Sequence, residues 1–98
     1  MGKYDLTSKA AEDLYDIWAY TVDTWSEEQA ERYYAKLINS FLAISAHPDT
    51  YGQSYDSIHE GLRGVHMGRH VIFFTKQPSG GALIVRILHE RRDYKRHL

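Results

Sequence analysis

The amino-acid sequence predicts an α+β fold in which a short N-terminal strand and an α-helical hairpin pack on an antiparallel β-sheet. Apolar residues recur every three to four positions through the first half of the chain, as they do along the buried face of a helix. Beyond residue 61, β-branched and aromatic residues gather in three short runs separated by glycine-containing turns, a pattern typical of an antiparallel meander. The chain has 98 residues, and we expect a single domain over residues 1–98.

The first half of the chain is predicted to hold one strand and two helices. Residues 4–6 form the strand, and a hydroxyl of Thr7-Ser8 caps a helix over about residues 9–24. Ser26 begins a capping box for the second helix, which ends at His47 because a proline follows. Only a few residues separate the two helices, so they are expected to pack as an antiparallel hairpin.

The second half is predicted to be mainly strand. A loop rich in glycine, proline and small polar residues covers residues 47–61. Three strands follow over residues 62–66, 70–75 and 82–89, and residues 94–98 add a helical turn.

The third of these strands is an apolar run that carries one arginine, Arg86. A buried guanidinium is unfavourable by several kcal/mol unless it is paired or opens to a cleft. Its partner is expected to be either a carboxylate of the helical hairpin, Asp13 or Asp16, or an anionic group on another molecule. The core residues expected from this strand are Leu83, Val85 and Ile87. Because all three precede residue 90, we expect the tail over residues 90–98 to be dispensable for folding.

Charge is distributed unevenly along the chain. Residues 1–59 hold ten acidic and four basic residues, whereas residues 60–98 hold three acidic and eight basic ones. Such a split favours an electrostatic docking face on the C-terminal part. The alternative is an ordinary mixture of solvated surface charges.

Composition excludes several classes of protein. The chain has no cysteine, so it holds neither disulfides nor a thiolate zinc site. No histidine pair has i,i+4 spacing on a predicted helix, and neither a metal site nor a cofactor is expected. The apolar stretches fall far short of the ~20 residues that span a bilayer, and nothing in the first residues resembles a signal peptide. We therefore expect a cytoplasmic protein without a membrane segment.

Short blocks spread over nearly the whole chain form a specific combination. They are Tyr4-Asp5-Leu6-Thr7, residues 10–14, Trp25 with Gln29-Ala30 and Tyr33-Tyr34, His47-Pro48, residues 58–63, residues 70–74 and residues 85–93. In this combination the chain resembles the ParE toxins, a branch of the RelE/ParE superfamily of type II toxin–antitoxin systems. The blocks over residues 60–63 and 85–93 are the most specific.

This resemblance implies the RelE/ParE-like fold and a plasmid- or chromosome-borne toxin of the kind that stabilises plasmids. It implies a hetero-oligomer with a ParD-like antitoxin, and inhibition of DNA gyrase by protein–protein binding, with no catalytic residues. It implies no sequence-specific nucleic-acid binding by the chain alone.

Two groups of residues are the candidates for these contacts. Those expected to bind the target are Arg63, Arg86, His89, Arg91, Arg92 and Asp93. Those expected to bind the antitoxin are Trp18, Trp25, Tyr34, Phe41 and Arg69. Each group has a structural alternative: the aromatic residues fall on helical stripes that are typical of a core, and Arg63 and Arg69 are placed like solvated charges beside turns.

A second function remains open on the sequence. RelE-like toxins are ribosome-dependent mRNA endoribonucleases, and metal-free RNA cleavage needs a base, an acid and cations for the phosphorane charge. The residues that could supply these groups are Arg63, Arg86, His89 and Tyr94. A third possibility is a partner domain that has lost its toxicity. Templates for phosphate-binding loops and metalloprotease helices do not match the chain.

Overall fold

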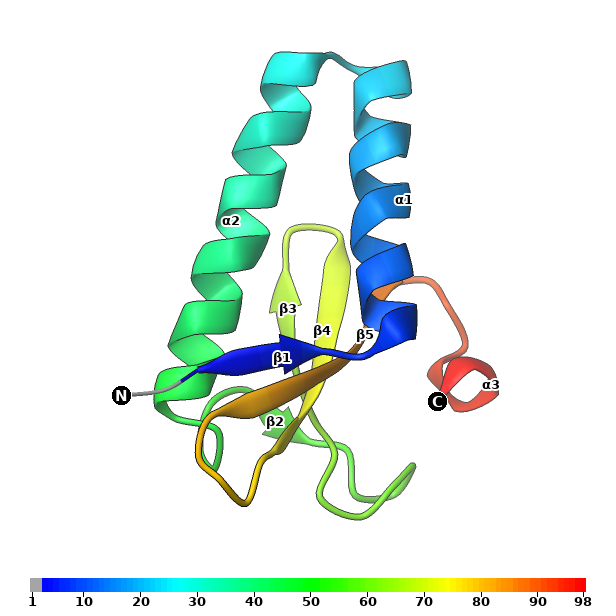
Figure 1. Cartoon of the computed structure of the whole chain (residues 1–98). Helices are drawn as coiled ribbons and strands as arrows, with labels where there is room; N and C mark the ends of the chain where they lie inside the picture. Colours follow the sequence, from blue (N-terminus) through cyan, green and yellow to red (C-terminus); the bar gives the residue numbers. More distant parts are fainter. Residues whose placement is uncertain (1–2) are drawn as a thin grey trace.

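The computed structural model describes residues 3–98 and places helices and strands in the predicted order (Figure 1). The elements are β1 (Tyr4–Leu6), α1 (Ser8–Thr24), α2 (Glu27–Ala46), β2 (Gln53–Ser54), β3 (Arg63–Met67), β4 (His70–Lys76), β5 (Ala82–His89) and α3 (Tyr94–His97). Met1 and Gly2, on which the signal-peptide expectation partly rests, lie outside the described residues. Within residues 3–98, none of the helices is long and apolar enough to cross a membrane.

Side-chain caps fix where the two long helices begin. The Thr7 hydroxyl accepts a hydrogen bond from the N–H of Ala10 at 3.0 Å and donates one to the carbonyl of Val85 at 2.7 Å. It therefore caps α1 and also ties the start of this helix to β5. The Ser26 hydroxyl accepts from the N–H of Gln29 at 3.1 Å, which is one half of the predicted capping box. The N–H of Ser26 donates to the carbonyl of Thr21 at 3.2 Å rather than to the Gln29 side chain. The helices lie side by side, and their connecting turn extends beyond the sheet (Figure 1).

The sheet has five strands in the order β1-β5-β4-β3-β2. The predicted antiparallel meander is confirmed for β3, β4 and β5. However, β1 pairs with β5 in parallel, so the sheet is mixed rather than antiparallel. Parallel pairing needs a long crossover, and the hairpin and meander between these strands supply it. The short strand β2 lies within the predicted loop and pairs with the start of β3.

A β-bulge in β5 changes which of its residues enter the core. Val85, between Ile84 and Arg86, has no register partner on β4. The extra residue shifts the alternation of side chains by one position, so Ile84 and Ile87 both pack against the helices although they are three positions apart. The prediction was right for Ile87 but wrong for Leu83 and Val85, which are only half-buried.

The sheet is covered on both faces. The first core, between the sheet and the helical hairpin, includes Leu37, Phe41, Ile44, Ile72, Phe74 and Ile84. A second core lies on the opposite face and consists of Leu62, Val71, Phe73 and Leu88. Tyr94 and Leu98 of the tail pack against this second core, with the Tyr94 and Phe73 rings 4.9 Å apart. The tail therefore covers apolar side chains, so its removal is expected to lower stability, contrary to the reasoning that all the apolar residues involved precede residue 90.

Deleting residues 90–98 is expected to lower the free energy of unfolding by about 2 kcal/mol or more, since two apolar side chains and their contacts are lost. Urea unfolding of the full and shortened chains measures the difference. Replacing the exposed Lys95 and Arg96 of the same tail by alanine is the control, with an expected change within about 0.5 kcal/mol per site. A shortened chain as stable as the full one would contradict the second core.

Candidate functional site

A groove of about 730 Å³ opens between the helical hairpin and one end of the sheet. Its helical wall includes Ile17, Tyr20 and Trp25, and its sheet wall includes Arg69, His70 and His89. The helical wall thus combines apolar and aromatic side chains with the polar Asp16, Thr21 and Gln29, whereas the sheet wall holds one arginine and two histidines. Concave sites with an apolar wall and a few converging polar groups are the usual form of binding sites.

Two large aromatic side chains of this groove are unusually open to solvent. Tyr20 is 67% exposed and Trp25 is 71% exposed. The interpretation of Trp25 as a core residue was therefore wrong: it follows the last residue of α1, at a hairpin turn that extends beyond the sheet (Figure 1). Exposed aromatic side chains beside a groove are typical of surfaces that bind a partner.

The sheet wall of the groove is held in place by Tyr33 of α2. The Tyr33 hydroxyl lies 2.7 Å from Nδ1 of His70 and accepts a hydrogen bond from the N–H of Arg69 at 3.1 Å. Gly68, in the turn between β3 and β4, has φ +62°, and a Cβ built there would lie 2.6 Å from the same hydroxyl. Glycine is therefore needed at this position both for its conformation and for the approach of the tyrosine.

Burial sets the protonation state of this pair. It lowers the pKa of His70 to about 4, with the neighbouring His89 adding to the effect, and it raises the pKa of Tyr33. At neutral pH the imidazole of His70 is therefore uncharged and the phenol keeps its proton. In that state the Tyr33 hydroxyl either donates to Nδ1 of His70, or accepts from Nδ1–H while donating to the carbonyl of Met67 at 3.2 Å, so these hydrogen bonds are compatible with both neutral tautomers of His70.

The other residues predicted to bind the antitoxin lie elsewhere. Trp18 and Tyr34 pack edge to face, with ring centroids 6.2 Å apart, and border a separate shallow depression beside Glu31. Tyr34 is 43% exposed, so it is not the core residue that its helical stripe indicates. Phe41 has no exposed surface and belongs to the first core. Its assignment to a contact surface was wrong, since its ring faces the sheet side of α2.

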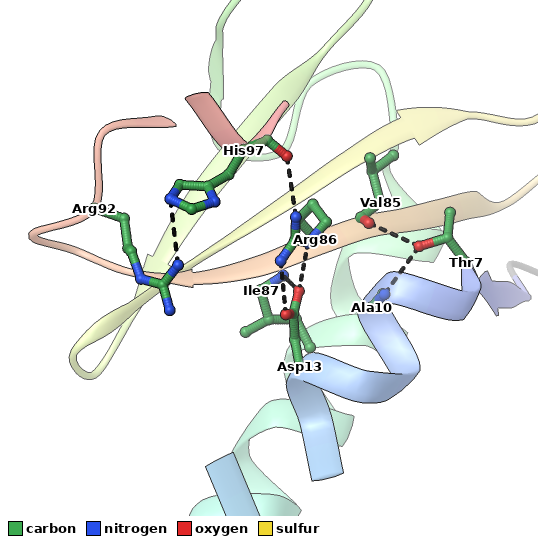
Figure 2. A network of polar contacts seen from close by, with 8 residues as sticks. All are labelled: Thr7, Ala10, Asp13, Val85, Arg86, Ile87, Arg92 and His97. Carbon is green, nitrogen blue, oxygen red and sulfur yellow. Dashed lines mark hydrogen bonds and ion pairs between the residues drawn. The ribbon is translucent and has the colours of Figure 1, made fainter. Parts of the chain in front are cut away.

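Arg86 is bound inside the protein (Figure 2). Its Nε and Nη2 donate to the two carboxylate oxygens of Asp13 at 2.8 and 2.9 Å, and its Nη1 donates to the carbonyl of His97 at 3.0 Å. Asp13 also accepts a hydrogen bond from the N–H of Ile87 at 2.9 Å. The last residue of β5 that pairs with β1 is Ile84, so this carboxylate binds β5 after the pairing with β1 has ended. The hydrogen bonds with the Asp13 carboxylate raise the pKa of Arg86. The prediction of an internal carboxylate partner is confirmed for Asp13, whereas Asp16 lines the groove.

The residues predicted to bind the target therefore do not form one surface. His89 lies in the groove, and Arg91, Arg92 and Asp93 form an exposed turn that follows it. Arg63, by contrast, lies near the other end of the sheet and donates to the carbonyls of Tyr51 and Gly52. We define the basic turn as residues 89–93; Arg63 and Arg86 lie outside it.

The groups that an endoribonuclease would need are also separated. Arg63 is in register with Phe74, which faces the helices, whereas Arg86 is in register with Phe73, which faces the second core. Tyr94 packs on the second-core face as well, and His89 pairs with His70 at the groove. Within residues 3–98 no group of three histidine, aspartate or glutamate side chains could hold a metal ion.

Sequence reasoning missed the residues that build the groove, above all Tyr20, Tyr33 and His70. Tyr33 falls on an apolar helical stripe and so reads as core, while its hydroxyl contacts the turn after β3. The pairing of His70 with His89 follows from the short turns of the meander, because the register of such strands fixes which residues face each other.

Comparisons with known proteins agree with this fold. A family described as the ParE toxin of type II toxin-antitoxin system, parDE, matches residues 4–94. The chain is 34% identical to Toxin ParE1 of Mycobacterium tuberculosis over 96 residues, which cover 98% of this chain and 97% of that protein. It is also 34% identical to Toxin ParE1 of Caulobacter vibrioides over 98 residues, covering 100% and 99% of the two chains.

A solved structure described as the chromosomal ParDE TA system from P. aeruginosa has the same fold, with a TM-score of 0.75 and 19% identity. The alignment covers 91% of this chain and 96% of that one.

Proposed function

Because the chain belongs to the ParE toxin family of type II toxin–antitoxin systems, we propose that it inhibits DNA gyrase by binding to it and that a ParD-like antitoxin neutralises it. The chain is the toxin of a ParDE system. The proposal concerns the target, the class of the antitoxin and the action in the cytoplasm, where gyrase works. It also concerns the residues that make each contact.

The observation that carries this proposal is the basic turn. Its cations are exposed, and the Arg91 guanidinium makes no hydrogen bond or ion pair with any group of residues 3–98. Both flanks of the turn are fixed: β5 precedes it, and α3 follows it, anchored on the second core by Tyr94. Exposed cations on a fixed frame are suited to an acidic surface of another protein, where charge complementarity gives rate and specificity.

The separation of the possible catalytic groups supports binding over RNA cleavage. A general base and a cation must approach one reacting phosphate within hydrogen-bond distance. Arg86 is already saturated by Asp13 and the carbonyl of His97, and Arg63 and Tyr94 lie on opposite faces of the sheet. The arrangement therefore favours the gyrase inhibitor over the RelE-like nuclease.

The groove is the proposed place for the antitoxin. Its exposed aromatic residues offer apolar area to an incoming peptide segment, and Arg69 offers a positive charge at the sheet wall. Trp18 and Tyr34 provide a second apolar contact on the outer face of the hairpin. Since His89 belongs both to the groove and to the basic turn, an antitoxin seated in the groove lies next to the target surface. This proximity explains how its binding neutralises the toxin.

Expression of the chain without antitoxin tests the proposal in cells. We expect induction of the DNA-damage response and filamentation, while bulk mRNA stays intact because gyrase rather than the ribosome is the target. Transcript integrity and a damage-responsive reporter are followed over the same interval. Rapid mRNA cleavage at ribosomal A sites without a damage response would favour the nuclease instead. Unimpaired growth at a verified protein level would indicate a domain that has lost its toxicity.

A further inference from the structure

The two imidazoles of the groove share a feature that the proposed function does not use. His70 and His89 are register partners on neighbouring strands, and their ring centroids lie 5.6 Å apart. In each ring Nδ1 already has a partner: the Tyr33 hydroxyl for His70, and the N–H of Arg91, which donates at 3.2 Å, for His89. Neutral His89 therefore carries its proton on Nε2, and His70 carries one there either when its Nδ1 accepts from the hydroxyl or when its ring is protonated. Each ring can thus offer an Nε2–H to a ligand.

Neither of these N–H groups is shut away from solvent. Within residues 3–98, neither Nε2 has a hydrogen-bond partner. Neither is fully buried, because the one fully buried side-chain polar atom without a partner in this part of the chain is the Ser45 hydroxyl. Both rings line the groove. Two N–H donors on adjacent strands, in a groove that Arg69 also lines, are groups from which a carboxylate accepts hydrogen bonds.

The hydrogen bonds around His70 can accommodate a second ring proton. If Nδ1 of His70 becomes protonated, the Tyr33 hydroxyl can accept from it and turn its own proton to the carbonyl of Met67, which lies 3.2 Å away. The Nδ1 of His89, by contrast, already accepts the N–H of Arg91 at 3.2 Å. An imidazolium at His70 can therefore form without the loss of a hydrogen bond.

The charged groups around His70 come from α1, the end of β5 and the turn before β4. Glu90 follows β5, Asp13 and Asp16 lie on α1, and Arg69 precedes the ring in the chain. Asp13 is committed to Arg86, and Asp16 stands on the helical wall of the groove. In the free protein, burial keeps His70 neutral near pH 7. A carboxylate placed at Nε2 would reverse this balance, because an opposite charge at hydrogen-bond distance favours the charged form of the ring.

We propose that the groove binds an aspartate or glutamate of the antitoxin at the Nε2–H groups of His70 and His89, and that His70 takes up one proton from solvent as this carboxylate docks. The inference rests on the proposed function and adds the chemistry of the contact. A large apolar side chain next to that carboxylate packs on Tyr20 and Trp25 of the helical wall. The excess of basic residues over residues 60–98 favours an acidic segment as the occupant.

The test is calorimetry of the full chain with the purified antitoxin encoded next to its gene. Titrations at pH 6.5 in buffers of low and high ionisation enthalpy count the protons exchanged. We expect uptake of about one proton per toxin, with affinity falling up to about tenfold per pH unit as the pH rises from the pKa of His70 in the free toxin, about 4, to its pKa in the complex, and levelling off above that. His70→Gln should abolish the uptake. The control is His66→Gln, at an exposed position on β3 that does not line the groove, and it should leave the uptake unchanged.

A measurement on the unmodified chain covers the case in which His70→Gln does not fold. NMR of the imidazole nitrogens at pH 6.5 should show His70 singly protonated in the free toxin and doubly protonated in the complex. Binding without proton uptake, uptake that persists in a folded His70→Gln variant, or a neutral His70 in the complex would each overturn this inference and leave the proposed function standing. Absence of any binding would overturn the antitoxin partnership itself.

Discussion

Replacing Arg86 by alanine is expected to lower the free energy of unfolding by about 3 kcal/mol or more. The substitution leaves Asp13, whose side chain is 13% exposed, without its charged partner. It also frees the carbonyl of His97 and so loosens α3 from β5. A buried carboxylate that loses its cation is destabilising by more than the pair itself contributes. Chemical denaturation of the purified variant measures the change.

Two matched variants separate this effect from a general loss of positive charge. Arg91→Ala removes an arginine that is exposed and unpaired within residues 3–98, and its expected change is within about 0.5 kcal/mol. Arg86→Lys keeps the charge but not the bidentate geometry, so its stability should lie between those of the native chain and Arg86→Ala. Equal stability of Arg86→Ala and Arg91→Ala would show that the internal ion pair does not hold the fold.

Reversal of both arginines of the basic turn, Arg91→Glu with Arg92→Glu, is expected to abolish toxicity in a protein that still folds. Reversing two positive charges that face an acidic surface of the partner weakens binding by about 3 kcal/mol or more, which is a hundredfold or greater loss of affinity. The fold should be nearly unaffected, because neither guanidinium pairs with a carboxylate in residues 3–98. Growth assays with thermal melts on the same proteins separate activity from stability.

Reversing Lys95 and Arg96 of α3 is the control for net charge. It changes the same number of charges a few residues away, outside the basic turn, at positions that are also exposed. We expect this variant to keep most of its toxicity. Loss of toxicity in both double variants would indicate a diffuse electrostatic effect, and full toxicity of the Arg91, Arg92 variant would remove the basic turn from the target surface.

Local patterns in the sequence were enough to predict the elements of the fold. Helical periodicity, the N-cap at Ser26 and the glycine-containing turns each depend on a few neighbouring residues, and these elements are present. The internal partner of Arg86 could also be predicted, because a guanidinium in an apolar strand has few alternatives to a carboxylate on the facing helix.

Features that depend on pairing between distant segments could not be predicted. The bulge at Val85 is a property of two strands together, and it decides which residues of β5 enter the first core. Tyr94 and Leu98 of the tail pack on the second core, on the face of the sheet opposite the helices. The tail is too short to show a periodic pattern from which this packing could have been predicted.

The candidate site was predicted only in part for a similar reason. His89 and Arg69 were named from their charge, and both line the groove. Their companions Tyr33 and His70 look like ordinary core and strand residues until the β3–β4 turn brings them together. The exposure of Trp25 depends on how far the hairpin extends past the sheet, and helical periodicity does not report that length.

Supercoiling by purified DNA gyrase in the presence of the purified chain is the most direct measurement of the proposed function. Relaxed plasmid, ATP and gyrase are incubated with increasing amounts of toxin, of the Arg91, Arg92 double variant, and of toxin premixed with antitoxin. We expect the native chain to block supercoiling or to accumulate cleaved DNA, and the other two samples to leave gyrase active. Undiminished supercoiling at a large excess of folded toxin, together with mRNA cleavage on translating ribosomes, would contradict it.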